Sequence, residues 1–137
     1  MSEIQIIKRN GNKDTLDLEK LHKVVFYACN GINGVSASEV EIKSSLQFYS
    51  GITSSEIQET LIKSAADLIS EEQPNYQWVA GRLICYHLRK MVYGQFEPCH
   101  ILELVQRNID QGFYAQELLE KYSTEDWEEL NAHLKHD

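Results

Sequence analysis

The first sixteen residues have the pattern of two short strands around a turn. Residues 4–8 (IQIIK) have the β-branched content typical of a strand. The Asn-Gly-Asn run at 10–12 favours a turn, because Gly and Asn tolerate a positive φ. Residues 13–16 return as a second short strand. The pattern predicts a β-hairpin over residues 4–16.

Apolar residues then recur at helical spacing in two segments. The first begins after Asp17, whose carboxylate is suited to accept the free N–H groups of a first turn, and ends at Gly31. The second begins at Ser38 and continues to Gly51. We therefore expect two helices between the hairpin and residue 51.

Two further helices follow with clearer boundaries. Thr53-Ser54-Ser55-Glu56 is a capping box that opens a helix running to about Ser70. Pro74 interrupts the chain, Asn75 is the predicted cap of the next helix, and Gly94 ends it. The fold class expected for residues 1–93 is mainly α, a β-hairpin lid over one end of a four-helix bundle. An isolated hairpin is unstable, so the strands must pack on the helices.

Residues 94–137 form a predicted second region, a short helical extension. Helices are expected near residues 100–110 and 114–121, on either side of Gly112. Ser123-x-x-Asp126 is a capping-box variant that opens a last helix, expected to reach residue 136.

The balance of acidic and basic residues also changes at residue 94. The 137 residues carry a net charge of −8. Residues 1–93 have 10 basic and 11 acidic side chains, whereas residues 94–137 have 3 and 10. A nucleic-acid partner is not expected at this balance, but the near-neutral first region is compatible with a small anion site. No apolar run approaches the roughly 18 residues of a membrane span, and the N-terminus lacks a signal-peptide pattern, so we expect no membrane and a cytoplasmic location.

The motifs of common catalytic sites are missing from the sequence. It has no phosphate loop, no Gly-x-Gly-x-x-Gly and no Gly-x-Ser-x-Gly. Cys29, Cys85 and Cys99 form no Cys-x-x-Cys pair and are interpreted as unpaired thiols. His133 and His136 lie on one predicted helix face, but two ligands at a chain end make a poor metal site. We expect neither a catalytic residue nor a metal site.

Cationic residues are the strongest candidates for ligand binding. Lys8 and Arg9 follow the first strand, Lys20 lies in the first helix, and Arg89 and Lys90 lie near the end of the fourth. These side chains would converge on one anion if the hairpin lies across the bundle, with help from helix N–H groups near Asp17 and Ser54. The alternative is that these cationic side chains bind no ligand and only form the solvent-exposed faces of the helices. Such a pocket would have apolar walls at Ile6, Leu16, Leu21 and Tyr86. On pattern alone, ordinary core packing explains these four positions better.

Seven runs of residues resemble the N-terminal ATP-cone region of a known enzyme subunit. It is the large (alpha) subunit of class Ia ribonucleoside-diphosphate reductases, of phage and enterobacterial type. The match covers essentially the whole chain and is most specific at 74–83. The matching runs are IIKRNG at 6–11, DLEKL at 17–21, QFYSGI at 47–52, IKSAADLI at 62–69, PNYQWVAGRL at 74–83, HLRK at 87–90 and YGQFEP at 93–98.

The resemblance implies an allosteric domain that binds ATP or dATP with Mg²⁺ and controls overall reductase activity. By position, the phosphate contacts would be Lys8, Arg9, Lys20 and Lys90. Asp14 and Asp17 would lie by the base, and Ser54 would supply a hydroxyl at a helix start. Ile6, Leu16, Leu21 and Tyr86 would frame the nucleotide.

Four positions depart from the enterobacterial pattern. Gln58 stands where that pattern has a histidine near the phosphates and sugar, and Asp17 replaces an asparagine by the base. Ser54 replaces a threonine and Tyr86 a phenylalanine, which are milder changes. These departures make nucleotide binding a firmer expectation than inhibition by dATP.

The catalytic barrel that follows the cone in that family has no counterpart in this sequence. We therefore expect part of a reductase that is inactive alone, either a split-gene product or a truncated subunit. The expected partners are the catalytic remainder of the large subunit and the radical-bearing small subunit, with a homo-oligomer as a further option. The alternative function is a degenerate cone that acts only as an interaction module for those subunits. A transcriptional repressor with an ATP-cone is excluded because no four-cysteine zinc ribbon precedes the cone.

Overall fold

The computed structural model describes residues 3–136, which divide into two compact units. The first unit ends at Leu88 and the second begins at Arg89. This division falls inside a helix, five residues before the predicted domain boundary after residue 93.

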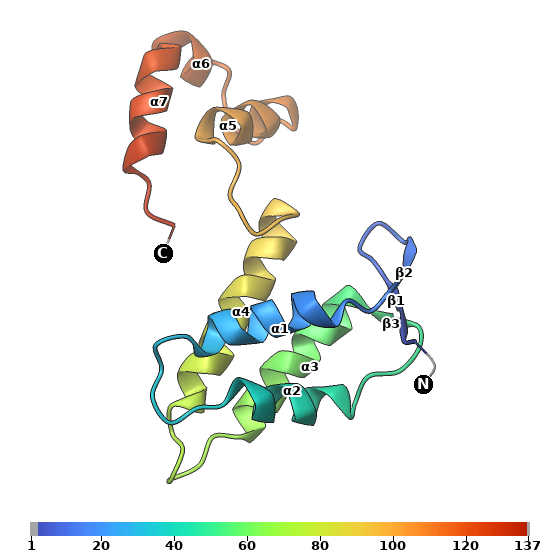
Figure 1. Ribbon diagram of the computed structural model, residues 1–137. Coiled ribbons are helices and arrows are strands. Elements are labelled where there is room, and N and C mark those ends of the chain that lie inside the picture. The colour runs from blue at the N-terminus through green and yellow to red at the C-terminus, as the bar shows by residue number, and fades with distance from the viewer. Residues whose placement is uncertain (1–2, 137) are drawn as a thin grey trace. The chain divides into compact units, whose positions relative to one another are not determined.

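A small sheet lies at one end of the first unit (Figure 1). Strands β1 (Gln5–Ile7) and β2 (Lys13–Thr15) pair antiparallel, which confirms the predicted hairpin. A third strand, β3 (Ile52–Thr53), pairs with β1 in parallel, so that the strand order is β2-β1-β3. No pattern in the sequence had predicted β3.

The turn of the hairpin is closed by its own backbone. Lys8 N–H donates to the Asn12 carbonyl at 2.8 Å, and Gly11 N–H donates to the Lys8 carbonyl at 2.9 Å. Gly11 has a φ of +83°, which an L-residue rarely adopts. The turn therefore fixes the register in which Ile6 faces Asp14.

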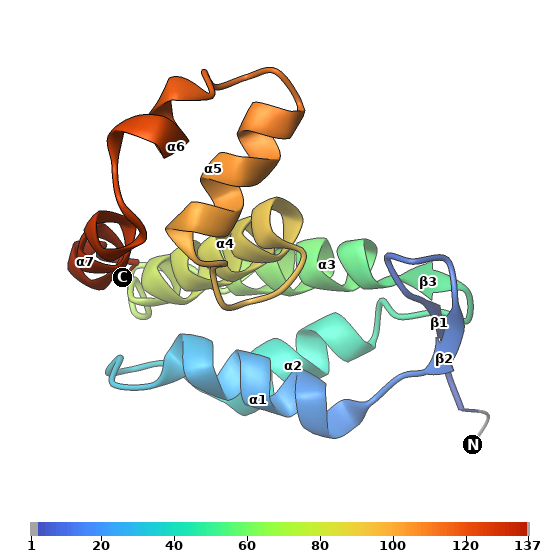
Figure 2. The same cartoon turned by 90° about the horizontal axis from the view of Figure 1, so that it is seen from above.

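Four helices form the body of the first unit, as the mainly α prediction requires. They are α1 (Leu18–Cys29), α2 (Ala37–Ser45), α3 (Ser54–Asp67) and α4 (Tyr76–Tyr93). Seen from above, α1 and α2 form one layer, α3 and α4 form another, and the strands cover one end (Figure 2). The side chains buried between these elements are Ile6, Leu21, Val25, Ala28, Val40, Ile52, Ile57, Leu61, Ala65, Tyr76, Val79, Ala80 and Leu83.

The predicted bounds of the second helix were wrong at both ends. Its N-cap is Ser36, not Ser38, and the helix ends at Ser45, well before Gly51. The earlier start has its reason in a contact distant in sequence: the buried Tyr76 hydroxyl accepts from Ser36 N–H at 3.0 Å and donates to a Glu39 carboxylate oxygen at 2.6 Å. Tyr76 thereby fixes the first turn of α2 from α4.

An arginine fastens the end of α1 to α4. The Arg82 Nη1 donates to the Asn30 carbonyl at 2.6 Å and to the Ala28 carbonyl at 3.3 Å. The last carbonyls of a helix have no partner inside it, so this guanidinium satisfies groups that would otherwise need water.

The second unit contains α5 (Ile101–Asp110), α6 (Glu117–Lys121) and α7 (Thr124–His133). The helix α5 packs against α7. Their buried residues are Val105 and Trp127. The predicted cap Ser123 and its partner Asp126 form a full capping box at the start of α7. The expected last helix ends at residue 133, not 136.

Among residues 3–136, no helix is long and apolar enough to span a bilayer.

Candidate functional site

Eleven of the twelve predicted nucleotide-binding residues lie in the first unit, and most lie at the end that carries the sheet. Lys90 is in the second unit, on the last turns of α4. The eleven are Ile6, Lys8, Arg9, Asp14, Leu16, Asp17, Lys20, Leu21, Ser54, Gln58 and Tyr86.

One carboxylate of the hairpin, Asp14, pairs with one cation of the predicted site and is influenced by a second. The Lys8 ammonium, just after β1, forms an ion pair with Asp14 on β2. The pKa of Asp14 lies below its usual value. The largest cause is the hydrogen bond from Lys8, followed by the hydrogen bond from the Thr15 backbone N–H at 2.9 Å, and the charge of Lys20 acts in the same direction. Because an exposed ion pair is weak, Lys8 is available to another anion at little cost.

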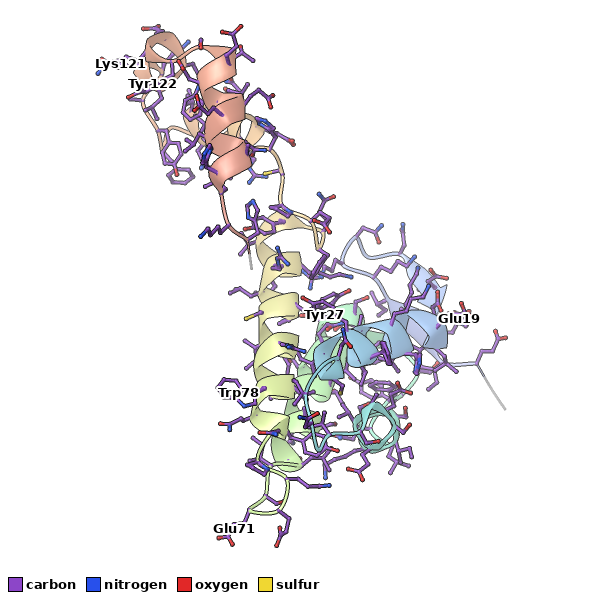
Figure 3. All side chains as sticks on the ribbon, turned by 60° about the vertical axis from the view of Figure 1, so that its left-hand side comes forward. Glu19, Tyr27, Glu71, Trp78, Lys121 and Tyr122 are labelled. Atoms are coloured by element: carbon purple, nitrogen blue, oxygen red, sulfur yellow. The ribbon has the colours of Figure 1, made fainter. Side chains whose placement is uncertain are left out.

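The first turn of α1 lies next to this pair. Asp17 caps the helix, because its Oδ1 accepts from Glu19 N–H at 3.0 Å and from Lys20 N–H at 3.2 Å, as predicted. The Lys20 ammonium lies 3.7 Å from the other Asp17 oxygen and is 77% exposed. Figure 3 shows the neighbouring Glu19 on the same turn. The Asp17 carboxylate is thus committed to the backbone, which leaves Lys20 as the mobile charge here.

The start of α3 is joined to the hairpin through β3. Ile7 pairs with Thr53, and the Ser54 hydroxyl donates to the Ile7 carbonyl at 3.5 Å. Thr53 N–H donates to a Glu56 carboxylate oxygen at 2.8 Å, which completes the capping box. This backbone hydrogen bond, followed by the Thr53 hydroxyl, lowers the pKa of Glu56. The N-terminus of α3 is therefore held beside β1.

Gln58 has an unsatisfied polar atom one helical turn after Ser54. Its Oε1 is buried and accepts no hydrogen bond from the described part of the chain, residues 3–136. A buried acceptor without a donor costs free energy, so it is a place where a ligand hydroxyl or amine would be favourable.

The predicted apolar frame is mixed in character. Ile6 and Leu21 belong to the core, with 9% and 7% of their surface exposed. Leu16 packs against that core and is half-buried, as is Tyr86 on α4. Lys90 follows Tyr86 by one turn of the same helix. Core packing therefore accounts for Ile6 and Leu21, whereas Leu16 and Tyr86 retain surface that a base can contact.

The remaining predicted cations have different surroundings. Arg9 is exposed in the hairpin turn. Arg89, in the second unit, lies over the Phe96 ring at 4.5 Å from its centre and donates to the His136 carbonyl at 3.3 Å. Within the first unit, the structure thus brings together Lys8 and Lys20, with Arg9 near the tip.

Two pockets lie away from these residues. One, of about 500 Å³, is formed along α1 and α2 and is lined by Leu18, Glu19, His22, Lys23 and Glu41. The other, of about 800 Å³, is in the second unit around Trp127. None of the twelve predicted residues lines either of these two pockets.

Thiols and imidazoles do not form a chemical centre in the described residues 3–136. No group of three His, Cys, Asp or Glu side chains is placed to hold a metal ion there. Burial raises the pKa of the Cys29 thiol above its usual value, which disfavours the reactive thiolate. His133 donates from Nδ1 to the Glu129 carbonyl at 2.8 Å.

The comparison with protein families gives one match, the ATP cone domain, over residues 4–91. This range contains the hairpin, the four helices as far as residue 91, and all twelve predicted residues. The chain belongs to the ATP-cone family, as the resemblance of its sequence motifs indicated.

Within the curated proteins, the chain is similar to large subunits of ribonucleotide reductases. It is 46% identical to the ribonucleoside-diphosphate reductase subunit alpha of Buchnera aphidicola subsp. Schizaphis graminum, over 96% of this chain. It is 44% identical to ribonucleoside-diphosphate reductase 1 subunit alpha of Escherichia coli (strain K12), again over 96% of the chain. For subunit alpha of Enterobacteria phage T4, the identity is 37% over the full chain. The chain spans 17–18% of the length of these relatives.

Proposed function

We propose that this chain is a regulatory domain that binds ATP or dATP with Mg²⁺ at the end of the bundle carrying the sheet. The observation that carries the proposal is the ion pair of Lys8 with Asp14, together with the Lys20 cation 3.7 Å from Asp17, beside the first turns of α1 and α3. Helix N-termini and charge-assisted donors together favour phosphate groups.

The charge of the predicted residues supports a phosphate ligand. Lys8, Arg9, Lys20 and Lys90 outnumber the two carboxylates, Asp14 and Asp17. No three-residue ligand cluster for a metal exists among residues 3–136, so Mg²⁺ would arrive bound to the phosphate oxygens of the nucleotide. It would lower the charge that these side chains must neutralise.

The buried Gln58 acceptor supports a sugar or base contact one helical turn from Ser54. A ribose hydroxyl is a donor that would satisfy Oε1. The half-buried surfaces of Leu16 and Tyr86 are suited to the base. ATP and dATP would act as two ligands that bias one equilibrium through different contacts.

By analogy with the relatives, the domain would control nucleoside-diphosphate reduction by the remainder of a reductase large subunit and its small subunit. Formation of a homo-oligomer is a further way in which the domain would exert this control. The chain supplies the effector site in this proposal, and the chemistry belongs to the other part of the enzyme.

Calorimetric titration with ATP and with dATP, in the presence of Mg²⁺, tests the proposal. We expect saturable binding that Lys20→Ala and Lys90→Ala each weaken by about fivefold or more, the loss of one charge-assisted contact. Lys63→Ala is the control, because Lys63 is exposed on α3 outside the predicted site. Unchanged affinity in both site variants would overturn the residue assignment.

A second function is favoured by the acidic charge of residues 94–137, which carry 10 acidic and 3 basic side chains. In this alternative, the cone is an interaction module that binds no nucleotide. Heat would then be absent with both nucleotides, and the chain would co-elute with the reductase subunits when nucleotide is omitted. The acidic residues 94–137 are its proposed docking region.

A further inference from the structure

We propose that the pocket beside α7 binds an arginine side chain of a polypeptide segment. The pocket lies wholly in the second unit and has a volume of about 800 Å³, within the range of sites that hold small ligands. Its walls are Tyr122, Asp126, Trp127, Glu129, Leu130 and His133. Figure 3 marks Tyr122, which precedes α7.

Three walls of the pocket offer hydrogen-bond acceptors. Asp126 uses Oδ2 for the capping box with Ser123 N–H at 2.8 Å, and its other oxygen takes no part in that cap. Glu129 adds a second carboxylate. His133 must donate from Nδ1 to the Glu129 carbonyl, since a carbonyl only accepts, and in that tautomer its Nε2 is an acceptor.

The remaining walls are aromatic and apolar. Tyr122 is 50% exposed and meets the Trp127 ring edge-on, with 5.8 Å between ring centres and an angle of 78°. Leu130 is 45% exposed. A guanidinium matches this combination, because it carries several donors in a plane and also stacks on aromatic faces, whereas an ammonium is a compact point charge.

One residue that lines the pocket also has a donor without a partner, which favours a ligand that carries a carbonyl beside the guanidinium. Trp127 is only 7% exposed, and its Nε1 makes no hydrogen bond within residues 3–136. This N–H is closed to solvent, so an acceptor reaches it only when the ring shifts on binding. A backbone carbonyl next to the arginine is such an acceptor, which a free organic cation lacks. A metal ion is a weaker fit, since no cluster of three ligands is found among these residues.

The charge of the surrounding segment favours a basic partner. Residues 94–137 carry 10 acidic and 3 basic side chains. Such a surplus steers a cationic segment toward the pocket and discourages an anionic one. The pocket lies outside the predicted nucleotide site, so the two proposals stand or fall separately.

Fluorescence of Trp127 provides a direct test. The chain has two tryptophans, and Trp78 is 61% exposed on α4, so Trp78→Phe leaves Trp127 as the single reporter. The probe is a blocked leucine–arginine–leucine tripeptide amide. Its matched control carries citrulline, which keeps the shape and the carbonyls but removes the charge. We expect a saturable change with the arginine peptide and about tenfold weaker binding of the citrulline peptide.

Two charge variants of α7 locate the binding. Glu129→Gln removes a pocket carboxylate and leaves the capping box in place, and we expect it to weaken the arginine peptide by about fivefold. Glu125→Gln removes the same charge from an exposed position outside the pocket, and we expect affinity within about twofold of the parent.

Four results would overturn the proposal, the last of them from a competition experiment. The first is absence of a saturable change, and the second is equal binding of the two peptides. The third is an equal loss in Glu125→Gln and Glu129→Gln, which would mean nonspecific attraction to the acidic segment. Spermidine serves as a competitor: displacement of the peptide at equal concentration would assign the pocket to small polycations.

Discussion

Lys8 is held by Asp14, so the cation predicted to contact phosphate already has a carboxylate partner across the hairpin. The two residues come from neighbouring strands, and the turn at Gly11 brings them together. An incoming phosphate must therefore compete with Asp14 for Lys8. This pair makes the position of the nucleotide testable, because Asp14 was predicted to lie by the base.

Asp14→Asn separates the two roles of this carboxylate. If Asp14 only competes for Lys8, removal of its charge frees the ammonium, and we expect ATP to bind about threefold more tightly by calorimetry. Asp67→Asn removes one charge at the far end of α3 and is expected to leave the affinity unchanged. Weaker ATP binding in Asp14→Asn would instead show that Asp14 contacts the base.

Gln58→Met replaces the buried amide by an apolar side chain of similar length. Without nucleotide, we expect the free energy of unfolding to rise by about 1 kcal/mol, because an unsatisfied buried acceptor is removed. With nucleotide, we expect ATP affinity to fall about fivefold, since the acceptor for a ligand donor is lost. Denaturant unfolding and calorimetry measure the two effects.

Gln47→Met is the matched control for that variant. The Gln47 amide donates to the Lys43 carbonyl at 3.1 Å and to the Ser64 hydroxyl at 3.2 Å, so the same replacement breaks satisfied bonds. We expect lower stability and unchanged ATP binding. If Gln58→Met also leaves ATP binding unchanged, Gln58 lies outside the nucleotide site.

Tyr76→Phe is expected to lower the free energy of unfolding by about 1–2 kcal/mol, measured in urea. The change deletes the hydroxyl that accepts from Ser36 N–H and donates to Glu39, while the buried ring remains. Tyr114→Phe, at an exposed residue, should change stability by less than about 0.5 kcal/mol. Equal effects of the two variants would contradict the role of Tyr76 at the start of α2.

Acid should weaken the capping box of α3. The pKa of Glu56 is lower in the folded chain than its ordinary value of 4.5, so the unfolded chain binds the proton more readily. The stabilisation is complete above about pH 4.5 and is lost as the pH falls through the folded value. We expect the decrease in Tm between pH 6 and pH 3 to be smaller for Glu56→Gln, which keeps an acceptor but does not titrate.

Glu59→Gln is the control for the acid experiment. Glu59 is exposed on the same helix and takes no part in the capping box. Its variant should lose as much Tm as the parent chain between the two pH values. A parent-like decrease in Glu56→Gln would show that other carboxylates cause the acid sensitivity.

Local signals predicted most of the fold. The caps at Asp17, Thr53 and Ser123 were recognised because each needs only residues two or three positions away. Two features required contacts distant in sequence and were missed. Strand β3 has two residues and exists only because it pairs with β1. Ser36 and Ser38 were equivalent as caps by spacing, since each precedes a glutamate by three residues, and the contact from Tyr76 selects Ser36.

The candidate site was predictable as a set of residues but not as a set of contacts. Sequence spacing placed Lys8 and Lys20 on neighbouring elements, yet it gave no sign that Asp14 pairs with Lys8. The pocket around Trp127 was also missed. Trp127 and Leu130 lie at helical spacing, but the prediction of this helix rested on the Ser123-x-x-Asp126 cap alone.

The parallel pairing of β1 with β3 has a consequence for the order of folding. Ile6 cannot meet Ile52 until the intervening chain, with α1 and α2, has returned the second strand to the first. Such a long loop closes slowly, whereas helices form from local contacts. The sheet end is therefore assembled late, and its short strands should exchange amide hydrogens sooner than the helical core. The sheet end, which would hold a nucleotide, is then the part of the domain that a bound nucleotide would stabilise most against local opening.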